Sequence, residues 1–117
     1  MLKGIRGAIN IENDDPETVE KATRELLEAL FQENNLQKEK ITAVFFTQTA
    51  DIVSAYPAKA ARDFGLSDIP LMSAQEPKVM GSMPRVIRVL ILTEMKEPDP
   101  VKHVYLKDAV KLRQDLA

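Results

Sequence analysis

The sequence contains no cysteine and no tryptophan, a single histidine, and only 5% aromatic residues. The absence of cysteine excludes thiol catalysis, iron–sulfur clusters and zinc sites built on thiolates. One histidine cannot form a multi-histidine metal site within one chain. The shortage of aromatic side chains leaves no obvious platform for stacking nucleic-acid bases. We therefore expect a protein without a metal or another cofactor, and without a nucleic-acid partner.

Long hydrophobic runs are missing as well. No stretch approaches the roughly 18 uninterrupted apolar residues that indicate a transmembrane helix. The first ten residues are too polar for a secretory signal peptide. These observations predict a cytoplasmic protein that does not enter a membrane. The formal net charge of −2 is also unfavourable for a general nucleic-acid-binding protein.

The residues that are present are typical of one folded domain. The 117 residues are 44% hydrophobic and 29% charged, so we expect a single domain over residues 1–117. Residues 12–40 carry nine acidic and four basic side chains, whereas the rest of the chain carries twelve basic and nine acidic ones. The small net charge therefore hides an acidic segment and a basic remainder.

The apolar pattern predicts a mixed sheet. Apolar and polar residues roughly alternate over residues 2–11, as in a half-buried strand. Residues 41–49 and 86–95 are rich in β-branched and apolar side chains and predict two further strands. The apolar centre of 41–49 suggests burial on both faces. Residues 70–75 and 101–106 are weaker strand candidates.

Two helices are predicted between these strands. Asp15 is a plausible N-cap for a helix that begins at Pro16 and ends near Asn34. A shorter helix over residues 58–64 is expected to stop at Gly65. This order of elements predicts an α/β or α+β domain with helices on one face of the sheet.

Arginines inside predicted strands are the most informative charged residues. Arg6 and Arg88 lie in apolar runs, where a buried charge is costly unless it is paired. Each could pair with a carboxylate of the same fold, or face a cleft that binds an anionic ligand. Arg62, Arg85 and Arg113 are further candidates for an anion site, although each alone suits a solvated surface. Glu76, considered alone, is a surface carboxylate or an ion-pair partner.

No familiar catalytic arrangement is visible in the sequence. A serine–histidine–aspartate combination and a glycine-rich phosphate loop are both missing, and His103 is interpreted as structural. If the protein is an enzyme, we expect it to act through fixed charges and hydrogen bonds rather than through a nucleophile.

Seven segments, in their order and spacing, match one known family. They are GIRGA (4–8), FTQTADI (46–52), YPAKAARDFG (56–65), QE (75–76), PRVIRVLI (84–91), HVYL (103–106) and LRQDL (112–116). Together they resemble the monofunctional chorismate mutases of the trimeric AroH class. No single segment is decisive, but the set covers nearly the whole chain.

The resemblance implies a fold and an activity. It implies a homotrimer with a pseudo α/β-barrel, a mixed β-sheet core with helices outside, and active sites between adjacent subunits. The implied reaction is the Claisen rearrangement of chorismate to prephenate, without a cofactor, in the shikimate-derived route to phenylalanine and tyrosine. In that transition state the ether oxygen gains negative charge, which a fixed guanidinium would stabilise.

The family pattern also assigns residues to the site. By resemblance, Arg88 lies beside the ether oxygen and a carboxylate, while Arg6 and Tyr105 bind substrate carboxylate. Glu76 accepts a hydrogen bond from the ring hydroxyl. Further substrate-binding residues implied by the resemblance are Tyr56, Ala58, Lys59, Arg62, Leu71, Met72, Ser73, Leu112 and Arg113.

Several of these residues are expected to act from a neighbouring subunit. That group comprises Tyr56, Ala58, Lys59 and Arg62, with Leu71 and Met72 lining the wall. Ser73 replaces a family cysteine and keeps a small polar side chain. Residues 108–117 are expected to form a mobile C-terminal tail that closes over the site.

Two alternatives from other functional classes remain at this stage. One is a trimeric sensor that binds anionic metabolites between subunits without turnover. The other is a related trimeric deaminase-like protein that hydrolyses enamines. The first would not require Arg6, Glu76 and Arg88 together, and the second lacks the set of supporting segments.

Overall fold

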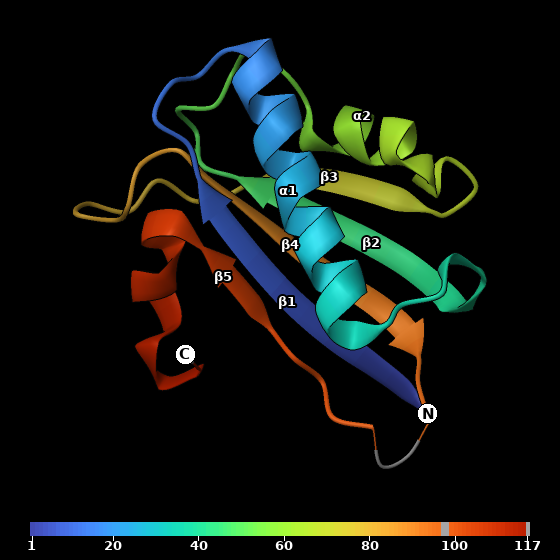
Figure 1. Ribbon diagram of the computed structural model, residues 1–117. Coiled ribbons are helices and arrows are strands. Elements are labelled where there is room, and N and C mark those ends of the chain that lie inside the picture. The colour runs from blue at the N-terminus through green and yellow to red at the C-terminus, as the bar shows by residue number, and fades with distance from the viewer. Residues whose placement is uncertain (97–98, 117) are drawn as a thin grey trace.

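The computed structural model describes residues 1–96 and 99–116. Its centre is a five-stranded sheet with the order β3-β2-β4-β1-β5 (Figure 1). The strands are β1 (Leu2–Asn10), β2 (Ile41–Gln48), β3 (Leu71–Gln75), β4 (Val86–Glu94) and β5 (Val104–Leu106). Strand β4 pairs antiparallel with β1 and β2, whereas β1–β5 and β2–β3 are parallel pairs. The mixed sheet confirms the predicted fold class.

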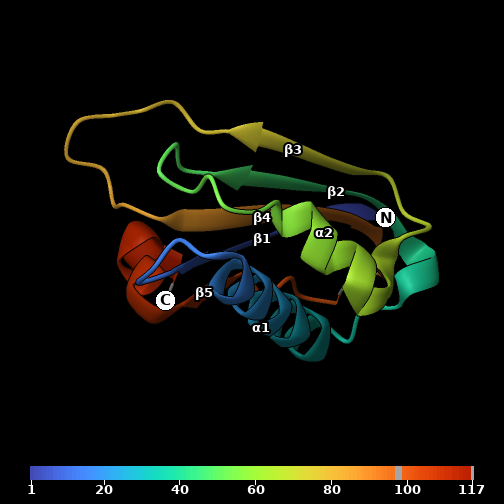
Figure 2. The same ribbon diagram turned by 90° about the horizontal axis from the view of Figure 1, so that it is seen from above.

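Helices α1 (Pro16–Asn34) and α2 (Pro57–Ala61) lie on one face of this sheet, as the two perpendicular views show (Figures 1 and 2). The other helical segments are η1 (Lys38–Lys40), η2 (Arg62–Leu66) and η3 (Lys107–Leu116), and η3 packs against Ala8 and Tyr105 on the opposite face. The Asp15 carboxylate accepts a hydrogen bond of 2.8 Å from the Thr18 N–H, which confirms the predicted N-cap. Asn35 ends α1 in the left-handed conformation, with φ of 49°.

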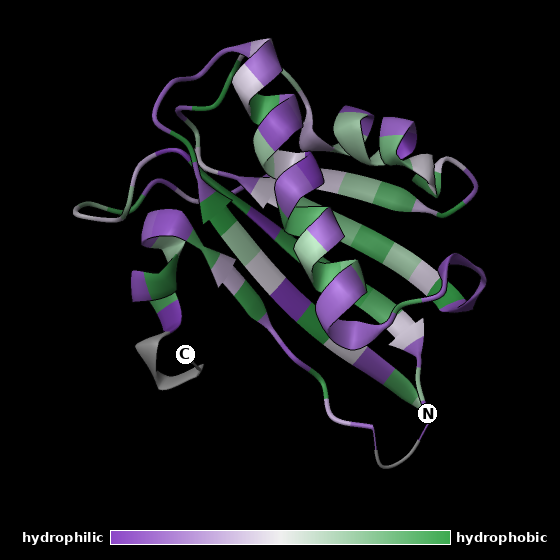
Figure 3. Cartoon of the chain, in the orientation of Figure 1, coloured by the Kyte–Doolittle hydropathy of each residue, from purple (hydrophilic) through white to green (hydrophobic). Residues whose placement is uncertain are grey.

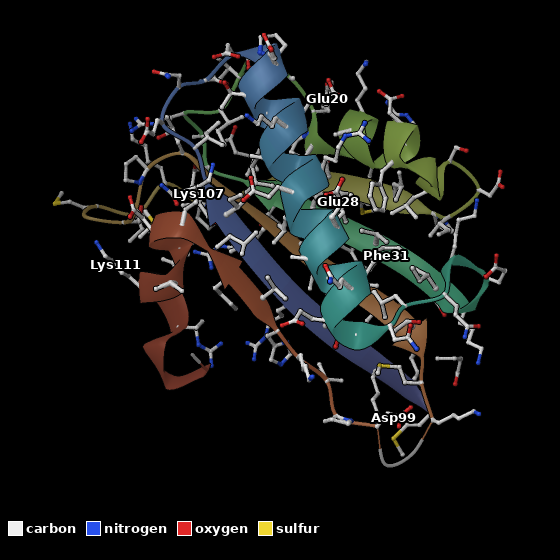
Figure 4. All side chains as sticks on the ribbon, viewed as in Figure 1. Glu20, Glu28, Phe31, Asp99, Lys107 and Lys111 are labelled. Carbon is white, nitrogen blue, oxygen red and sulfur yellow. The ribbon has the colours of Figure 1, made fainter. Side chains whose placement is uncertain are left out.

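The core lies between α1 and the sheet. Leu26, Leu27 and Leu30 of α1 are fully buried against Ile5 and Ile9 of β1. The opposite side of the helix is hydrophilic (Figure 3), and Glu20 and Glu28 point away from the sheet (Figure 4). The acidic excess of the sequence therefore lies largely on a solvent-facing helix surface.

Gly7 allows this close packing. A Cβ atom at Gly7 would lie 2.9 Å from Leu30 Cδ1 and 3.1 Å from Leu26 Cδ1, which is too close for an unshifted side chain. The glycine in β1 therefore marks a close approach of helix and strand, as expected for glycine in a strand interior. Close to Leu30 on α1, the Phe31 ring (labelled in Figure 4) packs edge-to-face on Phe64, with ring centroids 5.3 Å apart.

Two details differ from the sequence-based expectations. Within one chain, strand β2 is not buried on both faces, because Phe46 is buried but Phe45 is 37% exposed on the face without α-helices. The last strand is shorter than the predicted 101–106. The stop of the short second helix at Gly65 is confirmed, since Gly65 leaves the helical conformation with φ of 116°.

The C-terminal segment also has defined structure. Residues 107–116 form a 3₁₀ helix with a kink at Arg113, while Ala117, the last residue of the predicted tail, lies outside the described residues. None of the helices in residues 1–96 and 99–116 combines the length and the apolar character needed to cross a bilayer.

Candidate active site

A cleft of about 340 Å³ lies on the face of the sheet opposite α1. Its side chains come from four strands and from η3. The polar and aromatic ones are Arg6, Phe45, Thr47, Arg88, Tyr105 and Arg113. The cleft thus brings together four residues that the sequence singled out, Arg6, Arg88, Tyr105 and Arg113.

Strand register explains why these residues meet. Thr47 on β2 lies directly opposite Arg88 on β4. Ala8 on β1 lies between Arg88 on one side and Tyr105 on the other. Arg6 is two residues before Ala8, so its side chain projects from the same face. Four separate strands therefore direct functional groups into one space that the α-helices do not cover.

The cleft is cationic. Three of its lining side chains are arginines, and no carboxylate is among the described residues that line it. Clefts lined by charge of one sign concentrate ligands of the opposite sign. The arrangement therefore favours an anionic ligand, and a guanidinium can bind a carboxylate through two parallel hydrogen bonds.

Glu76 reaches the edge of the cleft by binding Arg88. The Arg88 Nε donates to Glu76 Oε2 at 2.9 Å, and Thr47 Oγ1 donates to the same oxygen at 2.6 Å. The side chain of Arg88 is 39% exposed and that of Glu76 is 17% exposed. Arg88 therefore pairs with a carboxylate of the same fold and also lines the arginine-rich cleft, where binding of an anion stays a prediction.

His103 supports the site without lining it. The backbone N–H of Arg6 donates to His103 Nδ1 at 3.0 Å, which places the ring proton on Nε2 in the neutral form. Burial lowers the pKa of His103, and the charges of Arg6 and Arg113 lower it further. The ring is a neutral acceptor that links β1 to the start of β5, in agreement with a structural role.

The C-terminal segment is anchored where it begins. Asn10 Oδ1 accepts hydrogen bonds from the backbone N–H groups of Asp108 at 2.7 Å and Ala109 at 3.2 Å. Ala109 is fully buried, and Leu112 packs against its cluster. From this anchor the segment extends to Arg113, which lines the cleft. Closure of residues 108–117 over a ligand stays a prediction.

A second set of predicted residues lies on α2 and η2, away from this cleft. Ala58 is buried in the core on the helix-covered side, and Tyr56 is 70% exposed. Lys59 pairs with Asp63 at 3.3 Å, and Arg62 is exposed. The cleft residues and this set therefore belong to different regions of the chain.

A carboxylate anchors the segment that leads into α2. Asp14 accepts hydrogen bonds from Ser54 Oγ at 2.6 Å and from the Val53 N–H at 2.9 Å. The hydrogen bond from the Ser54 side chain, followed by that from the Val53 backbone, lowers the pKa of Asp14. This contact fixes the approach to Tyr56 at the start of α2.

The predicted residues on β3 divide between the two faces of the sheet. Leu71 packs against the main core, and Ser73 pairs in register with the buried Phe46. Met72 pairs with Phe45 on the uncovered face and is 63% exposed. None of the three lines the cleft of the same chain.

Sequence reasoning missed the contribution of β2 to the cleft. Phe45 and Thr47 both line it, together with Leu90 of β4. Strand alternation indicates that Phe45 and Thr47 share a face. Without the register, however, nothing in the sequence shows that this face adjoins Arg88.

The fold is that of an α+β domain with a cleft lined by three arginines. Residues 2–116 match the family model for chorismate mutase type I, and the chain belongs to this family. The predicted family, enzyme class and chorismate mutase activity are thereby confirmed, together with a place in aromatic amino acid biosynthesis.

Named relatives agree with this assignment. A chorismate mutase AroH from Thermus thermophilus is 53% identical over 118 residues, covering 99% of this chain and 97% of the relative. A chorismate mutase AroH from Bacillus subtilis (strain 168) is 36% identical over 119 residues, covering 100% of this chain and 94% of the relative. A solved chorismate mutase structure from Clostridium thermocellum superimposes with a TM-score of 0.87 at 34% identity, covering 92% of this chain and 96% of that one.

Proposed function

We propose that the arginine-lined cleft is the site where this chorismate mutase converts chorismate to prephenate. The observation that carries the proposal is the convergence of Arg6, Arg88 and Tyr105 on one cleft, with Glu76 bound to Arg88 at its edge. The reaction requires no cofactor, because the rearrangement exchanges no electrons or protons with the protein. The proposal also places the enzyme in the cytoplasm.

Substrate binding uses the positive charge of the cleft. Chorismate carries two carboxylates, which Arg6, Arg88 and Tyr105 hold so that the two reacting carbon atoms approach each other. Fixing this compact conformer lowers the entropic part of the barrier. The family resemblance implied these roles, and the shared face of the three side chains supports them.

The chemical step breaks the ether C–O bond as a C–C bond forms within the same molecule. Negative charge develops on the ether oxygen, and the Arg88 guanidinium stabilises it more strongly in the transition state than in the bound substrate. Glu76 accepts a hydrogen bond from the ring hydroxyl and faces the side of the ring that becomes positive. The ion pair between Arg88 and Glu76 keeps both groups in place.

The complete site is formed by a homotrimer. Apolar side chains are exposed on the helix-free face, with Leu2 at 53%, Phe45 at 37% and Met72 at 63% exposure, and a neighbouring copy covers them. The neighbour contributes the residues that do not reach the cleft of their own chain, namely Tyr56, Ala58, Lys59, Arg62, Leu71, Met72 and Ser73. Leu112 and Arg113 then close over the bound substrate.

Two measurements test this proposal. Purified protein is mixed with chorismate, and loss of chorismate absorbance is followed together with formation of prephenate. Light scattering gives the mass of the active species. Turnover by a species of trimer mass is expected. Binding without turnover would favour the sensor, and an active monomer would refute the shared site.

A mixing experiment tests the shared site directly. Arg88→Ala and Arg62→Ala each inactivate a pure trimer, because each removes one half of every site. A mixed trimer of the two variants contains one site with both halves intact, so random mixing of equal amounts restores about a quarter of wild-type activity. No recovery after unfolding and co-refolding, with mixed trimers present, would contradict sites shared between subunits.

A further inference from the structure

Glu76 is held by a hydroxyl group to which the proposed reaction assigns no role. The Thr47 hydroxyl donates to Glu76 Oε2 at 2.6 Å, and Arg88 Nε donates to the same oxygen at 2.9 Å. Thr47 and Arg88 face each other across β2 and β4. One carboxylate oxygen therefore receives a donor from each of two neighbouring strands.

We propose that Thr47 is a positioning residue of the active site, which holds Glu76 and, through Glu76, orients Arg88. The inference rests on the proposed function. It assigns Thr47 no contact with substrate, and its effect on the reaction passes entirely through the Glu76 carboxylate.

The two carboxylate oxygens of Glu76 differ in their hydrogen-bond partners. Oε2 of Glu76 accepts both protein donors, whereas no hydrogen bond from residues 1–96 and 99–113 reaches Oε1. Oε1 is therefore the oxygen left for the ring hydroxyl of the substrate. The backbone of Glu76 is fixed separately, since its N–H donates to the Gln48 carbonyl at 2.9 Å. The backbone of Glu76 is thus already anchored, and Thr47 additionally restrains the Glu76 side chain.

The same contact orients the guanidinium. Arg88 uses Nε for Glu76, which leaves its two terminal nitrogens for a ligand in the cleft. Without the Thr47 hydroxyl, the Glu76 carboxylate would keep a single protein donor, and the Glu76 side chain would rotate more freely. Catalysis by fixed charge depends on groups that do not reorganise during the reaction.

Strand formation does not require this hydroxyl. A β-branched residue suits the position, and valine has nearly the same shape as threonine without the donor. Thr42 lies on the same strand, is exposed, and makes no side-chain hydrogen bond with the described residues. Thr42→Val is therefore a matched control for Thr47→Val.

The test measures kcat and KM for chorismate in Thr47→Val, Thr47→Ser, Thr42→Val and Glu76→Gln, and in the Thr47→Val/Glu76→Gln double variant. Thr47→Val is expected to lower kcat about 10- to 100-fold with a smaller change in KM, since a hydrogen bond to a charged group is lost. Thr47→Ser restores kcat to within a few fold, and Thr42→Val leaves it unchanged. In the Glu76→Gln background, Thr47→Val adds little, because the group it positions has already been altered.

Two results would overturn the inference. One is a Thr47→Val enzyme with wild-type kcat. The other is an equal loss from Thr47→Val whether or not Glu76 is present, which would show that Thr47 acts by another route. If Thr47→Val does not fold, Thr47→Ala removes the same donor with less demand on packing and gives the same comparison. Failure of the wild-type protein to rearrange chorismate would instead refute the proposed function.

Discussion

Replacement of Arg88 by lysine separates charge from geometry at the proposed centre of catalysis. Arg88 makes one charge-assisted hydrogen bond through Nε to Glu76 at 2.9 Å and has two terminal nitrogens that can face the substrate. Lysine has a single nitrogen on a flexible stem, so it cannot hold Glu76 and present a planar fork to the substrate at once. Arg88→Lys therefore keeps the positive charge but cannot both bind Glu76 and present a planar pair of donors to the substrate.

The expected cost is about 3 kcal/mol or more in the barrier, similar to the loss of one oxyanion donor. This corresponds to a decrease of about 150-fold in kcat. The assay is the initial rate of chorismate loss at saturating substrate. Arg24→Lys is the control, since Arg24 lies on the outer side of α1 and pairs with Glu20 at 3.4 Å. Turnover of Arg88→Lys within threefold of wild type would refute the reasoning.

Four further predictions concern the groups around the site. Gly7→Ala forces a methyl group to about 2.9 Å from Leu30 Cδ1, so we expect thermal or urea unfolding to show a loss of about 1–3 kcal/mol. Burial lowers the pKa of His103 in the folded protein, so the unfolded chain binds a proton at this residue more readily. The free energy of unfolding is therefore expected to fall as the pH drops below about 6.5. His103→Gln is expected to weaken this pH dependence. Between about pH 6 and 8 kcat is expected to be flat, and a bell-shaped profile abolished by His103→Ala would contradict this. Asn10→Ala releases the start of η3, so KM for chorismate rises more than kcat falls; an unchanged KM would mean that this anchor is not needed.

The elements with strong local signals could be predicted from the sequence. Asp15, Pro16 and Asn35 set the ends of α1 through capping preferences that depend on a few neighbouring residues. The strands around Arg6 and Arg88 were visible because apolar runs are interrupted by single charges. In both cases the physical cause lies within a short stretch of chain.

Features that depend on distant pairing could not be predicted. The interpretation of β2 as buried on both faces does not hold within one chain, because hydrophobicity alone does not show whether a face is covered by the chain's own helices or left open. The bond between Thr47 and Glu76 depends on the register of three strands, and the anchoring of η3 depends on Asn10, 98 residues before Asp108. The resemblance supplied the site residues, and only the folded sheet shows which of them share one cleft.

The position of β1 between β4 and β5 has a consequence for the order in which the protein can fold during synthesis. Arg6 and its hydrogen-bond partner His103 are 97 residues apart, and β1 has no other strand to pair with until β4 is made. At a synthesis rate of about 5–20 residues per second, His103 is synthesised about 5–20 seconds after Arg6. During that time α1 is the partner that is already available to the apolar side of β1. The cleft is therefore among the last parts of the molecule to form, because its two sides are made at opposite ends of the chain.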